Sequence, residues 1–225
     1  MNKFLNNLFQ FIIFFSVLFG CTINGEKNEE KLPVMGRSEI VERNVNGEIH
    51  TDTIPHRIDN FEFYNQDSMV VNNETLKGKI YIADFFFTTC PTICPVMKKQ
   101  MLRVYHEFND DDEIMILSHT IDPEHDTVAV LKDFAERLNV SSDKWHFVTG
   151  PKEKIYEIGQ KSYMVTANED NQAPGGFIHS GAFILVDKSQ RIRGLYDGTV
   201  PEQVDQLMFD IRRLKKEYTS NESAS

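Results

Sequence analysis

The stretch KIYIADFFFTTCPTICP, residues 79–95, decides the fold. Residues 79–87 form an almost continuous apolar run of strand length, which is typical of a parallel strand covered by helices on both faces. Pro95 cannot donate to a helical ladder, so a helix is predicted to begin there and to run over residues 95–108. Cys90 and Cys94 therefore lie between a buried strand and a helix, at the edge of the sheet where open α/β folds bind their ligands.

Strand and helix patterns alternate on both sides of this stretch. Upstream, a short hairpin is predicted over residues 61–64 and 69–71. Asp126 is the expected N-cap of the second helix. Downstream, the patterns predict strands over 113–118 and 145–149, helices over 127–138, 151–163 and 200–218, and a second hairpin over 177–186 and 191–196. We therefore expect an α/β fold with a central mixed β-sheet flanked by helices and an N-terminal β-hairpin extension.

The composition of the chain limits its partners and its architecture. Of 225 residues, 24 are Lys or Arg and 34 are Asp or Glu, which gives a net charge of −10. We expect no nucleic acid as a partner, because neutralisation of phosphates by basic residues supplies most non-specific affinity. Three cysteines are too few for a disulfide-rich secreted scaffold, and the length indicates one domain or two.

An apolar segment near the N-terminus predicts export from the cytoplasm. Residues 8–20 follow Lys3 and are too short to span a bilayer, which takes about 20 residues, but they have the size of a signal-peptide core. The run ends in LFGC, residues 18–21, which resembles the lipobox of bacterial lipoproteins. That resemblance implies a signal peptide over residues 1–20 and lipid attached to Cys21. The alternative is an uncleaved membrane anchor with an incidental cysteine.

The predicted location and the domain boundaries follow from this segment. A protein lipidated at Cys21 is held at a membrane of the bacterial cell envelope and faces the periplasm or the exterior. Residues 21–50 are polar and charged with no apolar period, which predicts a lipid-anchored linker. The folded domain is expected over residues 51–218, and a disordered tail over residues 219–225.

The two remaining cysteines form a closely spaced pair. At the start of a helix, backbone amides and the helix dipole are expected to lower the pKa of both thiols. Two thiolates this close either form a reversible disulfide or bind a soft metal ion. A purely structural disulfide is a third reading, but it would close a very small loop and constrain little chain entropy.

Several motifs occur in an order that resembles the Sco (SenC) family of copper-binding proteins. They are FFFTTCPTICPVM (residues 85–97), SHTIDPEHDT (118–127), WHFVTG (145–150) and a histidine, His179, before the apolar run 181–187. The resemblance covers residues 54–215. It implies a thioredoxin-like fold and delivery of copper to the binuclear copper-A site of cytochrome c oxidase subunit II. It also implies one copper, Cu(I) or Cu(II), bound by the thiolates of Cys90 and Cys94 and the imidazole of His179.

The chemistry of these side chains agrees with copper. Cu(I) prefers soft thiolates, and imidazole suits both oxidation states, whereas a structural zinc ion takes a fourth protein ligand. Two positions depart from the family pattern. Ile178 stands where the family has an acidic residue before the histidine, and Val128 replaces the proline that follows the Asp-Thr pair. Neither change removes a ligand.

Three other groups of side chains have alternative readings. Asp84 precedes Cys90 by six residues, the separation at which thioredoxins carry a buried acid for proton transfer; the alternative is a hydrogen-bonded acid without a catalytic role. Met97 and Met101 are expected to pack in the core rather than to bind copper. His119 and His125 are expected at the surface or in hydrogen bonds.

The leading hypothesis is therefore a copper metallochaperone and not an enzyme in the ordinary sense. Its expected partners are cytochrome c oxidase subunit II or a related copper enzyme, an upstream copper donor or thiol reductant, and the membrane through its lipid. The alternative is a membrane-anchored thiol-disulfide oxidoreductase, in which Cys90 attacks, Cys94 resolves and Asp84 assists proton transfer. A redox sensor that uses the pair only as a switch is a third hypothesis.

Overall fold

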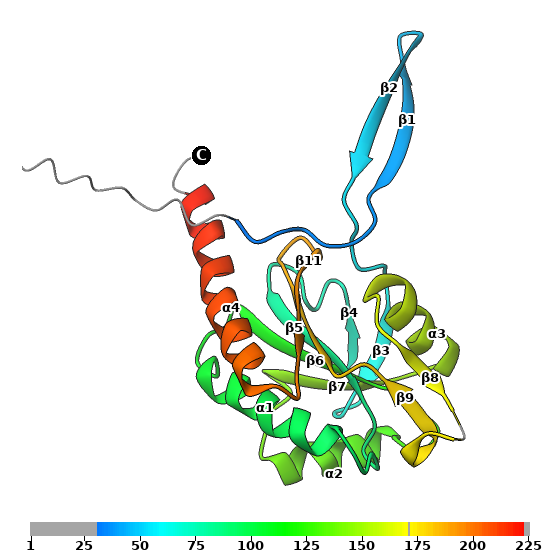
Figure 1. The fold of residues 1–225 in the computed structure, drawn as a ribbon, viewed down its shortest axis with the longest axis vertical. Helices are drawn as coiled ribbons and strands as arrows, with labels where there is room; N and C mark the ends of the chain where they lie inside the picture. Colours follow the sequence, from blue (N-terminus) through cyan, green and yellow to red (C-terminus); the bar gives the residue numbers. More distant parts are fainter. Residues whose placement is uncertain (1–30, 171, 223–225) are drawn as a thin grey trace, which may run out of the picture. The chain divides into compact units, whose positions relative to one another are not determined.

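The computed structural model describes residues 31–170 and 172–222, and of residues 178, 179, 221 and 222 it describes the backbone alone. Its centre is a seven-stranded sheet in the order β11-β10-β5-β6-β7-β3-β4 (Figure 1). Strands β5, β6 and β7 are parallel and the other pairs are antiparallel, so the predicted mixed sheet is confirmed. The strands are β3 (Glu62–Asn65), β4 (Val70–Asn72), β5 (Ile80–Phe86), β6 (Ile114–Thr120), β7 (Trp145–Thr149), β10 (Ala182–Val186) and β11 (Ile192–Asp197).

Helices cover both faces of this sheet (Figure 1). Phe86 of β5 stacks on Phe134, with 5.5 Å between ring centroids, whereas its neighbour Phe85 meets Tyr163 at 5.6 Å. Because successive strand residues point to opposite faces, the helix that carries Phe134 and the helical segment that Tyr163 follows lie on opposite sides of the sheet. The helices are α1 (Cys94–Glu107), α2 (Val128–Leu138), α3 (Lys152–Glu157), which continues into the π-helical turn η1 (Ile158–Ser162), and α4 (Pro201–Glu222).

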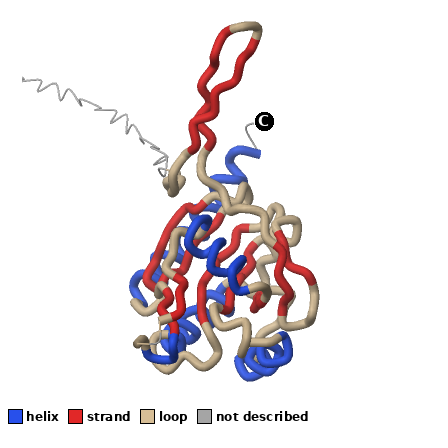
Figure 2. Tube along the Cα trace, turned by 90° about the vertical axis from the view of Figure 1, so that its right-hand side faces the viewer, coloured by secondary structure: helices blue, strands red, loops and turns tan. Residues whose placement is uncertain are grey.

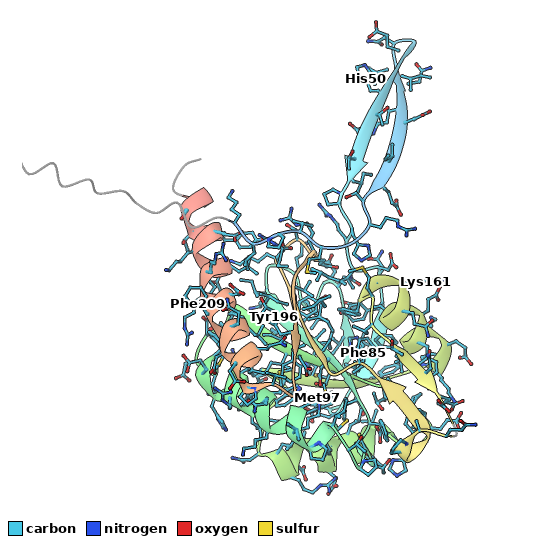
Figure 3. All side chains as sticks on the ribbon, viewed as in Figure 1. His50, Phe85, Met97, Lys161, Tyr196 and Phe209 are labelled. Atoms are coloured by element: carbon cyan, nitrogen blue, oxygen red, sulfur yellow. The ribbon has the colours of Figure 1, made fainter. Side chains whose placement is uncertain are left out.

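The core lies on both faces of the three parallel strands. Every residue of β5, β6 and β7 is buried, as expected for strands covered on both faces. Met97 and Met101 of α1 have no exposed surface and belong to this core (Figure 3 labels Met97). The prediction that these two methionines pack in the core is confirmed.

The predicted strand over residues 177–186 is two strands. β9 (Phe177–His179) pairs with β8 (Ala167–Glu169) in a small separate sheet, and β10 begins only at Ala182. Between them, the Ser180 N–H donates to the carbonyl of Thr166, and Gly181 follows. His179, Ser180 and Gly181 interrupt the apolar pattern at this change of partner, but the prediction treated the segment as one strand.

A hairpin occupies part of the segment predicted to be a linker. β1 (Glu39–Val45) pairs with β2 (Glu48–Ile54) around Asn46 and Gly47, whose φ angles are 57° and 92°. Positive φ at both central positions is the geometry that an Asn-Gly hairpin turn adopts. The hairpin contains no buried residue and extends away from the large sheet in Figures 1 and 2. The predicted boundary at residue 51 therefore falls inside β2.

The C-terminal tail also differs from the prediction. Helix α4 continues to Glu222, so residues 219–222 are helical rather than disordered. The hydroxyl of Thr219 donates to the carbonyl of Lys216 at 3.1 Å and that of Ser220 to the same carbonyl at 2.8 Å. These bonds add side-chain donors to a carbonyl in the last turns of the helix.

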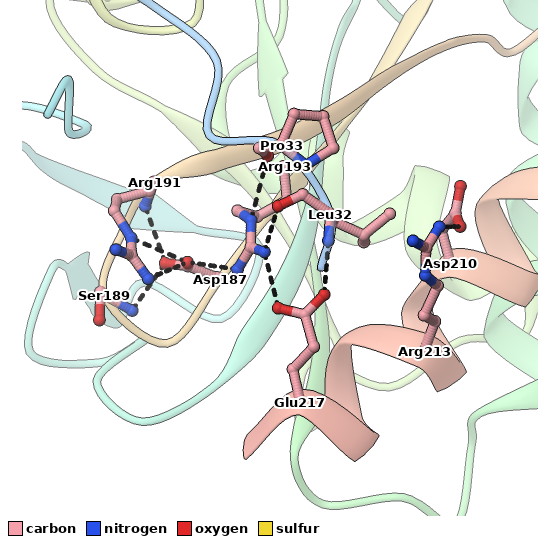
Figure 4. A network of polar contacts seen from close by, with 9 residues as sticks. All are labelled: Leu32, Pro33, Asp187, Ser189, Arg191, Arg193, Asp210, Arg213 and Glu217. Atoms are coloured by element: carbon pink, nitrogen blue, oxygen red, sulfur yellow. Dashed lines mark hydrogen bonds and ion pairs between the residues drawn. The ribbon is translucent and has the colours of Figure 1, made fainter. Parts of the chain in front are cut away.

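A network around Arg193 holds the first described residues against the domain (Figure 4). Arg193 is 4% exposed, and its guanidinium pairs with Asp187 at 3.1 Å and with Glu217 at 2.7 Å. It also donates to the carbonyls of Leu32 and Pro33, at 2.6 and 3.1 Å, and the Leu32 N–H donates to Glu217. This cluster, the Arg193 network, attaches residues 32–33 to β11 and α4.

The predicted signal peptide and the lipidation site Cys21 lie outside the described residues. Across residues 31–170 and 172–222, the structure contains no helix long and apolar enough to cross a membrane.

Candidate metal centre

The two cysteines lie where β5 gives way to α1. The chain turns after Phe86, and the Cys90 N–H donates to the carbonyl of Phe87 at 3.3 Å. Cys94 is the first residue of α1, one position before the predicted start at Pro95. Both side chains are thiols and nearly buried, with exposures of 8% for Cys90 and 5% for Cys94. The turn thus presents two adjacent soft donors at the carboxyl end of a fully buried strand.

The two thiols have opposite pKa shifts. For Cys90, burial opposes ionisation, but hydrogen bonds from the backbone N–H groups of Thr92 and Cys94 outweigh it, and the pKa is lowered. For Cys94, burial raises the pKa, and the nearby charge of Lys98 only partly opposes this. The prediction that both thiols have a lowered pKa is therefore right for Cys90 and wrong for Cys94, because Cys94 lies deeper in the apolar core.

The segment that carries His179 packs over the cysteine turn. Phe177 of β9 meets Phe87 with 5.0 Å between ring centroids. Gly175, at φ 84°, lies so close that an added Cβ would be 2.9 Å from the Phe87 ring and 3.1 Å from Pro91. His179 ends β9, with its backbone paired to Ala167. The structure thus brings the strand of His179 and the two cysteines to one edge of the sheet.

Side-chain geometry is described for the cysteines and not for His179. Among the described side chains, no group of three or more His, Cys, Asp or Glu is arranged to hold a metal ion. Of the three predicted ligands, the side chains of Cys90 and Cys94 are described. Two adjacent thiols, one of them with a lowered pKa, fit a soft metal such as Cu(I).

Asp84 lies beneath this turn and is fully buried, with both carboxylate oxygens engaged. Lys98 donates to one oxygen at 3.1 Å, and the hydroxyl of Ser118 donates to the other. Ser118 in turn accepts the indole N–H of Trp145 at 2.9 Å, and the Lys98 ammonium lies 3.8 Å from the centroid of the Phe86 ring. Lys98 connects this group to the cysteines, since its charge acts on Cys94. Sequence reasoning missed Lys98, because a lysine on a helix is ordinarily a solvated residue.

Asp126 holds the cysteine turn in place through hydrogen bonds to Thr88. The sequence pattern predicts it instead as the N-cap of the second helix. Its buried carboxylate accepts the Thr88 N–H at 3.0 Å, the Thr88 hydroxyl, and the Thr120 hydroxyl at 2.5 Å. Thr127 is the N-cap of α2 in place of Asp126, because its side chain accepts the N–H of Val130. Asp126 therefore fixes the residue two positions before Cys90. The sequence placed Asp126 in a recognised motif but did not reveal this partner.

The two histidines of that motif behave differently. His125 bonds Asp126 at 3.0 Å, as expected, and this hydrogen bond raises the pKa of the imidazole. His119 is fully buried, and neither ring nitrogen meets the geometry of a hydrogen bond, so the expectation was wrong for it. Its ring stacks on Phe85 at 4.8 Å. Burial lowers the pKa of His119 to about 3, with the backbone of Asp84 acting in the opposite direction.

Known proteins share both the sequence and the fold. The chain is similar to the SCO1 protein homolog of Bacillus subtilis, with 32% identity over 163 residues that cover 72% of this chain and 84% of the relative. The SCO1/SenC family lipoprotein of Bacillus anthracis superposes with a TM-score of 0.66 at 26% identity, covering 71% of this chain and 95% of that one.

Two further solved structures are similar. BsSco, described as a member of the Sco family of cytochrome c oxidase assembly proteins with a disulfide switch, has a TM-score of 0.63 and 32% identity, covering 72% of this chain and 94% of its own. Yeast Sco1, solved with copper bound, has the same fold, with a TM-score of 0.56 at 23% identity, covering 70% and 90%. The thioredoxin-like fold is therefore confirmed.

The family model described as SCO1/SenC matches residues 51–216, which include the cysteine turn, Asp126 and His179. This chain belongs to the SCO1/SenC family.

Proposed function

We propose that this chain binds one copper ion through Cys90, Cys94 and His179 and supplies it to a cytochrome c oxidase during assembly. The observation that carries this proposal is the pair of adjacent, nearly buried thiols at the edge of the sheet. Strand β9, which ends at His179, packs on the same turn through Phe177. Two thiolates and one imidazole suit copper in either oxidation state. They also leave a coordination position through which a receiving ligand can enter.

The recipient we propose is the copper-A site of cytochrome c oxidase subunit II, or the site of a related copper enzyme. The description of BsSco as an oxidase assembly protein and the copper held by yeast Sco1 support this assignment. Transfer proceeds by ligand exchange, in which thiols of the recipient replace Cys90 and Cys94 one at a time. The copper ion is cargo in this scheme and is not consumed.

The copper site is tested by titrating the reduced full chain with Cu(I) and Cu(II) beside a His179→Ala variant. His50→Ala is the matched control, because His50 lies on the exposed β1–β2 hairpin (Figure 3). We expect one copper per chain and a thiolate-to-Cu(II) absorption band in the parent and the control. In His179→Ala the affinity is expected to fall more than about tenfold, since even outer partners of a metal ligand contribute about 10–100-fold.

Two results would contradict this proposal. Copper affinity in His179→Ala equal to that of the parent would remove His179 from the ligand set. A parent that binds no copper in either oxidation state would remove the function altogether. Delivery is then measured separately, as copper transfer to the copper-depleted domain of an oxidase subunit II.

Thiol-disulfide exchange is the second candidate function, favoured by the direct hydrogen bond between the two cysteine side chains. The Cys90 thiolate would attack a partner disulfide, form a mixed disulfide and release one partner thiolate. Cys94 would then attack that mixed disulfide, close the Cys90–Cys94 bond and release the second partner thiol. Fast reduction of a model disulfide by the parent, together with unchanged copper binding in His179→Ala, would favour this function. Asp84→Asn tests whether the buried acid assists the exchange.

We further propose that residues 1–20 are a signal peptide and that lipid on Cys21 holds the domain at the outer side of a bacterial membrane. The description of the B. anthracis relative as a lipoprotein supports this proposal. Labelling of cells with a fatty-acid analogue should mark the parent but not a Cys21→Ser variant. Equal labelling of both would refute the anchor.

A further inference from the structure

An apolar cleft leads from the cysteine pair along the groove between α1 and α2, which lie side by side in the lower part of Figure 1. Its volume is about 360 Å³, enough for two or three side chains. Cys90 and Cys94 line one end, and the walls are formed by partly exposed apolar side chains: Leu102, Phe134 and Leu138. Phe134 is held in place by its contacts with Phe86 and Phe147, so the wall that it forms is rigid.

Both cysteines line this cleft, so a ligand in the cleft can reach their sulfur atoms. Because Cys90 and Cys94 are only 8% and 5% exposed, a ligand that replaces them at a metal ion has to insert its own donor atom beside them. A donor on a flat surface cannot do this, whereas a cysteine on an extended segment can. An apolar residue next to that cysteine would occupy the space between Leu102 and Leu138.

The charges around the cleft oppose those of the whole chain. Lys98 and Lys99 line it, and none of its lining residues is acidic, although the chain carries a net charge of −10. The ammonium group of Lys98 forms a buried ion pair with Asp84. Lys99 is exposed and makes no ion pair with any of the described residues. By contrast, the cavity beside Phe61 on the domain is lined by Asp59, Glu62 and Glu157 with a single lysine.

We propose that this cleft binds the cysteine-bearing segment of the protein that receives the copper, and that it selects an extended segment with a bulky apolar residue and an acidic residue next to the cysteine. The apolar side chain fills the groove, and the carboxylate pairs with Lys99. Complementary charge at the rim of an interface raises the association rate and rejects segments of the wrong charge. This inference rests on the proposed function, because it names the chemistry of the partner for the same site.

The recognition step is measured without copper. Short synthetic peptides carry one cysteine as a 2-thiopyridyl disulfide, followed by Leu and Glu, by Leu and Lys, or by Ser and Glu. The Cys90 thiolate attacks the peptide sulfur, a Cys90–peptide disulfide forms, the peptide–pyridyl bond breaks, and 2-thiopyridone leaves with the electron pair and a proton. The rate of 2-thiopyridone release from the reduced full chain reports docking for each peptide.

Lys99→Glu is the main variant because its side chain is exposed, and Lys154→Glu, on the opposite face, is its matched control. The parent and the control should react about fivefold faster with the Leu-Glu peptide than with the Leu-Lys peptide, and Lys99→Glu should reverse this order. Leu102→Gln should remove the preference for Leu over Ser. A parent that does not discriminate between the peptides, or a Lys99→Glu variant that keeps the preference of the parent, would overturn the proposal.

The copper titration separates this inference from the function on which it rests. A chain that binds copper normally but reacts equally with all three peptides retains the function and loses the docking cleft. A chain that discriminates between the peptides but binds no copper retains the cleft and loses the copper function.

Discussion

At one end of the central sheet, β5 runs into a turn with two thiols, while at the other end β10 and β11 join beside the Arg193 network. The pairing of Tyr81 with Val186 places the loop between β10 and β11 at the start of β5, opposite the cysteines. At the Arg193 end, the guanidinium of Arg193 pairs with Asp187 and Glu217, and Asp187 also pairs with Arg191, so these charges are neutralised within the chain. At the cysteine end, the chain supplies donors that a soft metal or another thiol can use.

This difference gives the two ends different roles. The Arg193 end contributes to the stability of the fold, and the cysteine end can exchange a metal ion or a disulfide with a partner. Buried ion pairs with full hydrogen bonding make an element costly to open, so the segment at residues 32–33 is firmly attached. The cysteine turn has no such charge of its own and depends on Asp126 for its position. Because the two ends share strands but no side chains, damage to one should change stability and damage to the other should change metal binding.

The largest effect is expected from Arg193→Met. Removing the guanidinium leaves Glu217 without its cation and Asp187 paired with Arg191 alone, and breaking a buried ion pair typically destabilises a protein by about 3–5 kcal/mol. Urea unfolding of the full chain measures this loss. Arg43→Met is the control, because Arg43 pairs with Asp52 on the exposed hairpin and should contribute less than about 1 kcal/mol. A copper affinity that falls with the stability of Arg193→Met would break the separation between the two ends.

Asp126→Ala should lower both the stability of the fold and the copper affinity of the cysteine turn. The change leaves the Thr88 N–H and the Thr120 hydroxyl without an acceptor, for a loss of about 2–3 kcal/mol. Because Thr88 precedes Cys90 by two residues, the copper affinity should fall as well, and titration with copper checks this. Asp133→Ala, which removes an exposed carboxylate of α2, is the matched control. Unchanged copper affinity in Asp126→Ala would show that the turn keeps its position without this acceptor.

Gly175→Ala tests the packing of the His179 segment on the cysteine turn. At φ 84° an alanine is strained by about 1–2 kcal/mol, and its Cβ would also meet the Phe87 ring. Gly176→Ala has the same backbone strain at φ 83° but no atom within 4 Å of the added Cβ. We expect Gly175→Ala to lose more stability than Gly176→Ala, and only Gly175→Ala to bind copper more weakly. Equal copper affinities would mean that the contact with Phe87 does not position His179.

His119→Phe should have the smallest effect near neutral pH, and it concerns a group that neither end uses. The folded chain keeps His119 neutral down to about pH 3, whereas the unfolded chain takes up a proton near the ordinary pKa of 6.5. Stability is therefore lost as the pH falls below about 6.5, by about 1.4 kcal/mol per pH unit for this group. In His119→Phe this slope should be absent from unfolding curves measured between these pH values. A parent and variant with parallel pH profiles would show that His119 finds a partner on protonation.

Sequence patterns predicted the parts of this site that depend on neighbouring residues. The apolar run of β5 and the prolines after it placed Cys90 and Cys94 in a turn at the edge of the sheet, and the structure agrees to within one residue. Met97 and Met101 were assigned to the core from helical spacing alone. Hydrophobic periodicity and proline geometry act over a few residues, so they can be read from the chain directly.

Partners of buried polar groups were decided only by the tertiary structure. Asp126 bonds a threonine 38 residues away, and Arg193 bonds carbonyls about 160 residues before it. Lys98 and His119 read as ordinary surface or turn residues until packing buried them. The sequence by itself determined the family motifs, the strand before the thiols and the start of the helix. Strand order and register determined which side chains meet beneath the thiols, because those contacts join elements that are distant along the chain.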